Sequence, residues 1–157
     1  MRFHTALTGR ATVVALVLTL LLQVACTAAL LATDDGWLAL GTAVVVARLA
    51  MTRTGLPGVP FAEGSALGRM VAASVSRAWL AGSVLVVGAL LAAITALVAD
   101  PADAARLIGA AGAGLLAAEL LHRRATARLG GVTGDVMGAM GEVATSATLL
   151  GAAVLLG

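Results

Sequence analysis

Charged residues and glycines gather at the start of the last apolar segment, in the stretch HRRATARLGGVTGDVMGAMGE, residues 122–142. A glycine-rich turn that leads into a helix presents free backbone N–H groups and a partial positive charge, which together suit a phosphate. Arginine side chains on the same side would add charged donors to phosphate oxygens. The stretch therefore predicts phosphate binding, although a helix cap at Asp135 and ordinary boundary arginines would give the same pattern. The candidates here are Arg123, Arg124, Arg128, Gly130, Gly131, Thr133 and Gly134.

Two carboxylates occupy this segment. Asp135 and Glu142 are seven residues apart, which places them on one helix face about 10 Å apart. A carboxylate inside a membrane span is costly and usually faces a cavity or a partner, so Glu142 is predicted to be functional. The alternatives are a structural pairing with an arginine such as Arg48, or a buried neutral acid. Arg48 itself either extends to the headgroups or points into the same cavity.

The elements that position these residues are predicted to be membrane-spanning helices. Hydrophobic residues make up 61% of the chain and charged residues 11%, and the mean hydropathy is +1.05. Apolar runs of about 20 residues are long enough to cross a bilayer. We expect an all-α polytopic protein, one integral membrane domain over residues 1–157, with about five spans: 11–32, 37–51, 78–99, 104–121 and 135–156. Aromatic residues make up only 3%, so base-stacking platforms are missing and no nucleic acid is expected.

The connections between these spans alternate in charge. The turns TDDG and DPAD are acidic, whereas nine of the ten arginines fall on the other side. Positive loops stay in the cytoplasm, which predicts a cell-membrane protein with a cytoplasmic N-terminus and a cytoplasmic active face.

Two further patterns predict local structure. Residues 65–79, SALGRMVAASVSRAW, have apolar residues at helical spacing, which predicts an amphipathic helix on the cytoplasmic surface. Small residues four apart allow close helix packing in lipid. These pairs are Gly134 and Gly138, Gly109 and Ala113, and Ala110 and Gly114.

The stretch RRATARLGGVTGDVMGAMGEVATSATLL resembles the C-terminus of the cobalamin synthase (adenosylcobinamide-GDP ribazoletransferase) family, which carries an Arg-Leu-Gly-Gly-Val-Thr-Gly-Asp core followed by a glycine and a glutamate. In this chain the core is residues 128–135, followed by Gly138 and Glu142. The segment VVVARLAMTRTGLPGVPFAEGSALG is similar to the family's central stretch. Its plausible matches are Arg48, Pro60, Gly64 and Gly68. At the start, Arg2 and Gly9 partly fit a family turn whose acidic residue is missing here.

The resemblance implies a membrane transferase of cobalamin biosynthesis that joins α-ribazole, or its 5′-phosphate, to adenosylcobinamide-GDP and releases GMP. It implies catalytic roles for Asp135 and Glu142, with Asp135 a possible Mg²⁺ ligand, and phosphate binding by Arg48, Arg53 and the arginines and loop residues named above. The family's upstream acidic metal motif does not occur in this chain. We therefore expect the chain to correspond to the C-terminal part of the family, as a fragment or as one half of a split enzyme.

The competing hypothesis is a small non-enzymatic membrane protein. It would be transporter-like and use Glu142 as an ion site, or it would be an inactive remnant of the enzyme. A homo-oligomer is also compatible with the sequence.

Overall fold

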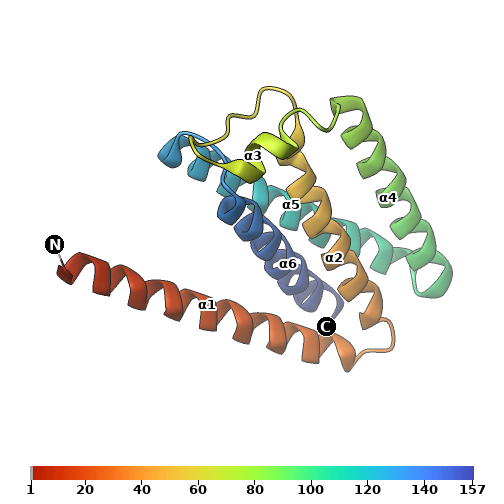
Figure 1. Cartoon of the computed structure of the whole chain (residues 1–157). Coiled ribbons are helices and arrows are strands. Elements are labelled where there is room, and N and C mark those ends of the chain that lie inside the picture. The colour runs from red at the N-terminus through yellow and green to blue at the C-terminus, as the bar shows by residue number, and fades with distance from the viewer. Residues whose placement is uncertain (1) are drawn as a thin grey trace.

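The computed structural model describes residues 2–157, and it describes side chains from residue 12 onward except those of Leu67 and Arg69. Arg2 and Gly9, which partly fit the family turn, therefore lie outside the part of the chain whose side chains are described. The described chain forms helices and an isolated bridge, but no strand. The elements are α1 (Arg2–Leu31), α2 (Gly36–Thr52), the 3-10 turn η1 (Arg53–Gly55), α3 (Ala66–Val71), α4 (Arg77–Val98), α5 (Pro101–Leu129) and α6 (Gly134–Leu156) (Figure 1).

Four of the described helices are long and apolar enough to cross a membrane. They are α1 from Thr12 to Leu31, α4, α5 and α6. The fifth predicted span, α2, has 17 residues, which corresponds to about 26 Å at the usual helical rise. The prediction of an all-α polytopic membrane protein is confirmed.

Helix boundaries follow local capping chemistry. The Asp100 side chain accepts a hydrogen bond from the Ala102 N–H (2.8 Å), and Pro101 occupies the first helical position of α5, where its missing N–H costs nothing. Helix α5 ends at Gly130 in the left-handed conformation (φ 74°). Helix α5 is longer than the predicted span 104–121. Arg123, Arg124 and Arg128, which were expected in the loop after that span, therefore lie on the last turns of α5.

The predicted amphipathic helix over 65–79 is wrong beyond Val71. Ala73 adopts a positive φ of 53°, and the Val75 N–H donates to the carbonyl of Gly55 in η1 (3.1 Å). The Ser76 side chain then accepts from the Trp79 N–H (3.1 Å) and begins α4. A serine N-cap and a tertiary hydrogen bond thus outweigh the helical spacing of the apolar residues.

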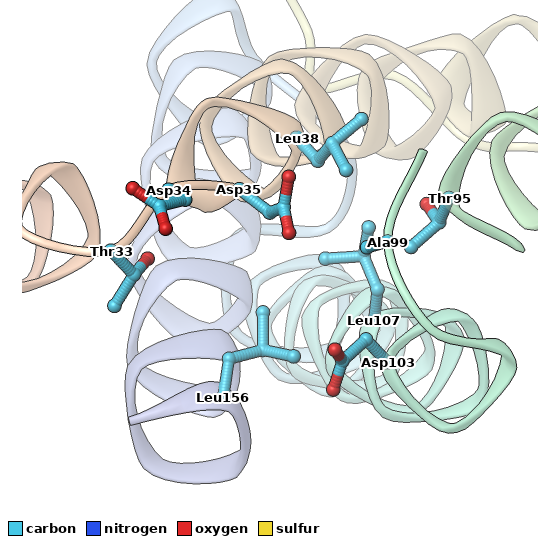
Figure 2. Close-up of a pocket in the computed structure, with 9 residues that line it drawn as sticks. All are labelled: Thr33, Asp34, Asp35, Leu38, Thr95, Ala99, Asp103, Leu107 and Leu156. Carbon is cyan, nitrogen blue, oxygen red and sulfur yellow. The ribbon is translucent and has the colours of Figure 1, made fainter. Parts of the chain in front are cut away.

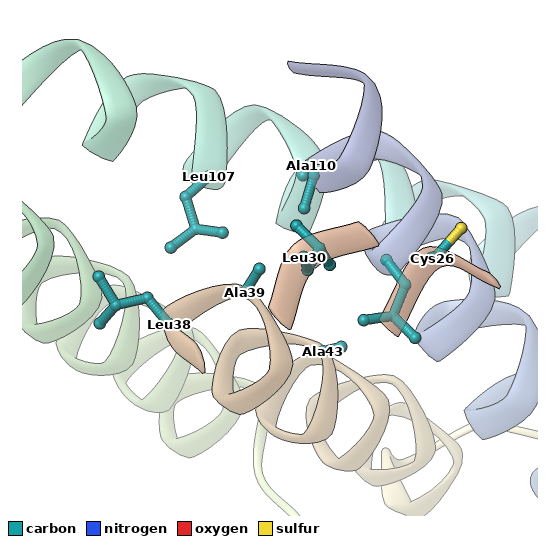
Figure 3. Close-up of a cluster of buried hydrophobic side chains, with 9 residues drawn as sticks. Cys26, Leu30, Leu38, Ala39, Ala43, Leu107 and Ala110 are labelled. Carbon is teal, nitrogen blue, oxygen red and sulfur yellow. The ribbon is translucent and has the colours of Figure 1, made fainter. Parts of the chain in front are cut away.

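Helices α2, α5 and α6 form the packed centre of the bundle. Small residues allow this close approach, because a Cβ on Gly114 of α5 would overlap Thr148 Oγ1 and come within 2.8 Å of the Ala144 carbonyl oxygen of α6. The packing role predicted for Ala110 and Gly114 is confirmed. Around the same centre Figure 3 shows one buried apolar cluster, to which α1, α2, α5 and α6 all contribute: Cys26, Leu30, Leu38, Ala39, Ala43, Leu107, Ala110, Leu149 and Ala152.

The packing role predicted for Gly109, Ala113 and Gly138 is wrong within this chain. A Cβ on Gly109 or Gly138 would meet no heavy atom within 4 Å, and Ala113 is exposed. Four-residue spacing selects one face of a helix, but it does not say whether another helix covers that face.

Helices α1 and α4 lie at the periphery. Toward its N-terminal end α1 diverges from α6 (Figure 1), and most of its side chains from Thr12 to Leu22 are exposed. Helix α4 packs along α5 and buries only Thr95. Both helices thus present broad apolar surfaces, as lipid-facing helices do.

The two predicted classes of connection lie at opposite ends of the bundle. The α1–α2 turn, the α4–α5 turn and the end of α6 together line a cavity of about 200 Å³ with Asp34, Asp35 and Asp103 at its rim (Figure 2). We call this the acidic end. The arginine end comprises η1, the loop at residues 60–62, the last turns of α5 and the α5–α6 turn. Hydrogen bonds join the loop to the α5–α6 turn, and an ion pair joins η1 to α5. Which end faces the cytoplasm stays a prediction.

Candidate functional site

A groove opens where α1 diverges from α6. Its floor is the α6 face that carries Asp135, Gly138 and Glu142, and its wall is the α1 segment from Thr12 to Leu20. The cavity measures about 780 Å³, which is within the size range of ligand pockets. We call it the α1 lobe.

A second cavity lies on the other side of the same α6 face. Arg48, with Val44, Ala47 and Met51 of α2, faces Gly138, Gly141, Glu142 and Thr145 of α6 across about 320 Å³. We call it the α2 lobe. Gly138 and Glu142 line both lobes, so the two lobes meet along the α6 stripe and form one two-lobed groove.

Arg48 lies on the wall of the α2 lobe, which favours the cavity alternative over extension to the headgroups. It also lines a hollow of about 290 Å³ beside η1, together with Thr54 and Val75. Arg48 and Glu142 share the α2 lobe, but Glu142 belongs to none of the three ion pairs found among the described side chains. The structural pairing considered from the sequence is therefore not formed.

Glu142 is held from α1 instead. The Gln23 amide nitrogen donates to Glu142 Oε2 (2.9 Å) and to Ser146 Oγ (3.0 Å). The Ser146 hydroxyl in turn donates to the Glu142 carbonyl (2.8 Å). This network joins α1 to α6 beside Glu142, which lines the groove.

Two of the candidate arginines share one carboxylate. Glu119 accepts from Arg123 Nε (2.8 Å) and lies 3.2 Å from Arg53 Nε. Two guanidinium groups around one carboxylate leave one positive charge in excess at the arginine end. Arg124 and Arg128 are exposed and belong to none of the ion pairs of the described residues.

The glycine-rich turn is packed against the loop at residues 60–62. A Cβ on Gly131 would overlap the backbone of Phe61 and Ala62. The Val132 N–H donates to the Pro60 carbonyl (2.9 Å), and the Ala62 N–H donates to the Val132 carbonyl (3.1 Å). Gly131 is thus needed for close approach between two backbones, a structural explanation for a glycine that the sequence suggested for phosphate.

Thr133 begins α6 by accepting from the Val136 N–H (3.2 Å). The first-turn N–H groups of Gly134 and Asp135 have no partner within the helix, so they are the amides of this turn that remain available to an anion. Asp135 lies in that first turn, is exposed and faces the α1 lobe.

The described residues contain no group of three or more histidine, cysteine, aspartate or glutamate side chains placed to hold a metal. Asp135 offers a single carboxylate. The residues described here therefore do not make a metal site by themselves.

Gln23 was not among the residues predicted from the sequence to belong to the site. It is 119 positions from Glu142 and lies inside the first apolar run. The available signal was an amide within an apolar span, because such a side chain usually hydrogen-bonds to a neighbouring helix. The sequence could not say which helix.

Comparison with known proteins gives concordant results. The family model described as cobalamin-5-phosphate synthase matches residues 5–153. A relative from Frankia casuarinae, named adenosylcobinamide-GDP ribazoletransferase, is 35% identical over 133 residues, which cover 83% of this chain and 48% of the relative. The chain thus spans about half the length of the curated relative it matches. No solved structure matches.

Proposed function

This chain belongs to the cobalamin-5-phosphate synthase family, and we propose that it carries part of the active site of a membrane transferase. The reaction joins α-ribazole, or its 5′-phosphate, to adenosylcobinamide-GDP and releases GMP. One observation of this chain carries the proposal: an arginine and a carboxylate, Arg48 and Glu142, line the same groove inside a bundle of membrane helices.

The reaction is a substitution at phosphorus. An oxygen of the ribazole substrate attacks the phosphorus that carries cobinamide, a new P–O bond forms, and the bond from that phosphorus to the GMP oxygen breaks. The attacking oxygen is a hydroxyl, whether or not the substrate carries a 5′-phosphate, and it releases its proton to water as the new bond forms. Because GMP leaves with the electrons of the broken bond, donors and positive charge placed around it lower the barrier.

We assign this role to the arginines. Arg48 lines the α2 lobe directly, and Arg124 and Arg128 on the last turns of α5 are exposed. Arg53 and Arg123, with their shared Glu119, add an excess positive charge at the same end. The first-turn amides of α6 complete the proposed set of phosphate donors.

We assign Glu142 to fix a substrate hydroxyl and Asp135 to orient the phosphates at the mouth of the α1 lobe. Mg²⁺, which would neutralise phosphate charge, remains part of the proposal. Asp135 would supply one carboxylate, and the other ligands would come from phosphates and from outside the described residues.

The setting we propose is the cell membrane, with the arginine end in the cytoplasm. The partners are the two substrates, the bilayer and the segments that make up the other half of the family's length. Those segments reside in the same polypeptide or in a separate chain, and a second copy of this chain, as a homo-oligomer, is the alternative partner.

The test is complementation of a strain that lacks cobalamin synthase. We expect no growth from this chain alone and growth when it is co-expressed with the half of the Frankia relative that it does not match. Growth from the chain alone would show that no other half is needed. Absence of growth in every combination, with both parts in the membrane, would contradict the transferase.

The same assay tests the site. We expect Asp135→Asn and Arg128→Ala to abolish growth without lowering the amount of protein in the membrane, because the first removes the carboxylate assigned to orient the phosphates and the second removes a charged phosphate donor. The control is Arg106→Ala, which removes an arginine paired with Asp103 at the acidic end and should leave growth intact. Growth with both site variants would remove this site assignment.

A further inference from the structure

We propose that Gln23 of α1 is a positioning residue that orients the Glu142 carboxylate toward the substrate. The inference rests on the proposed function and deepens it, because it names a residue on another helix that determines how Glu142 acts.

The hydrogen bonds fix the orientation of both side chains. Both N–H groups of the Gln23 amide are used, one by Glu142 Oε2 (2.9 Å) and one by Ser146 Oγ (3.0 Å). The amide turns its nitrogen, and not its oxygen, toward Glu142, whose carboxyl oxygen accepts the hydrogen bond. The Ser146 hydroxyl accepts from Gln23 and donates to the Glu142 carbonyl (2.8 Å), so its own direction is set too.

This arrangement holds one carboxylate oxygen and leaves the other open. Within the described residues, Glu142 Oε1 has no hydrogen-bond partner, and the side chain lines both lobes of the groove. A hydrogen bond to a carboxylate is stronger than one between neutral groups. Gln23 therefore fixes the carboxylate while Oε1 remains available to a substrate hydroxyl.

The competing explanation is that the Gln23–Glu142 hydrogen bond only holds α1 against α6. In that case it makes no difference to the reaction which of the two helices carries the carboxylate. The swapped pair, Gln23→Glu with Glu142→Gln, separates the two accounts. It keeps an amide–carboxylate bond between the same two helices but moves the carboxylate to α1.

The experiment measures transfer kinetics and thermal unfolding of the membrane-embedded protein, together with the co-expressed half if complementation requires it. We expect Gln23→Leu to lower kcat about 10-fold with little change in KM, because orientation is lost and binding is not. The swapped pair should recover the unfolding temperature of the wild type and keep the low kcat of Glu142→Gln. Ser146→Ala removes only the second acceptor of Gln23 and should therefore lower kcat less than Gln23→Leu does. Adding Gln23→Leu to Glu142→Gln should cause no further loss of kcat.

The outcomes are distinguishable. Full activity of the swapped pair, or of Gln23→Leu, in an active wild-type background would overturn the positioning role and leave the transferase standing. A wild type that carries out no transfer would overturn the proposed function itself.

Discussion

The two faces of α6 differ in what covers them. One face is buried against α5 and α2, with Met140, Ala144, Thr148 and Ala152 all inaccessible to solvent. The other carries Asp135, Gly138 and Glu142, which are exposed and line the groove. A single helix thus supplies both packing and chemistry. Changes to the packed face should lower stability, whereas changes to the groove face should alter function with little loss of stability.

The largest effect is expected at the centre of the packed face. Met140→Ala removes a fully buried side chain, which should lower the free energy of unfolding by about 2–5 kcal/mol. Val143→Ala, a matched truncation at a half-buried residue of the α1 lobe, should cost about 1 kcal/mol or less. Thermal or chemical unfolding in detergent measures the stability of both variants. Equal losses of stability would contradict the expected difference between the two faces of α6.

A smaller effect is expected where α5 meets the packed face. The methyl group of Gly114→Ala would overlap Thr148 Oγ1, and such overpacking typically costs about 1–3 kcal/mol. On the same helix, Gly112→Ala meets no heavy atom within 4 Å and should be neutral or gain up to about 1 kcal/mol from the lower backbone entropy of alanine. A Gly114→Ala protein as stable as Gly112→Ala would show that these helices are not closely packed.

The smallest effect on stability is expected on the groove face. At Gly138 a Cβ would meet nothing within 4 Å, so Gly138→Leu should change the free energy of unfolding by about 0.5 kcal/mol or less. Because the new side chain occupies the junction of the two lobes, it should nevertheless abolish complementation. Gly109→Leu, at an equally open position of α5, is the control and should retain it. Growth with Gly138→Leu would show that the activity does not depend on the groove.

The sequence predicted the helices more reliably than the connections. The last span was predicted as 135–156 and is Gly134–Leu156, because a helix start and a long apolar run are both local properties. The predicted surface helix at residues 65–79 is interrupted at residues 72–76, because the Val75–Gly55 hydrogen bond joins segments 20 residues apart. Among the site residues, the seven-residue spacing of Asp135 and Glu142 predicted a shared face, and both line the α1 lobe. Their roles stay predictions.

The sequence by itself determined the class of fold, the family and the stripe of acids and glycines on α6, because hydropathy, motif and helical periodicity act over a few turns. Only the tertiary structure decided which groups meet across the bundle. It placed Glu119 between Arg53 and Arg123, Gly131 under the Phe61–Ala62 backbone, and Gln23 against Glu142. Each of these contacts depends on how the helices are angled and rotated relative to one another, and that geometry is determined by the packing of side chains far apart in the chain.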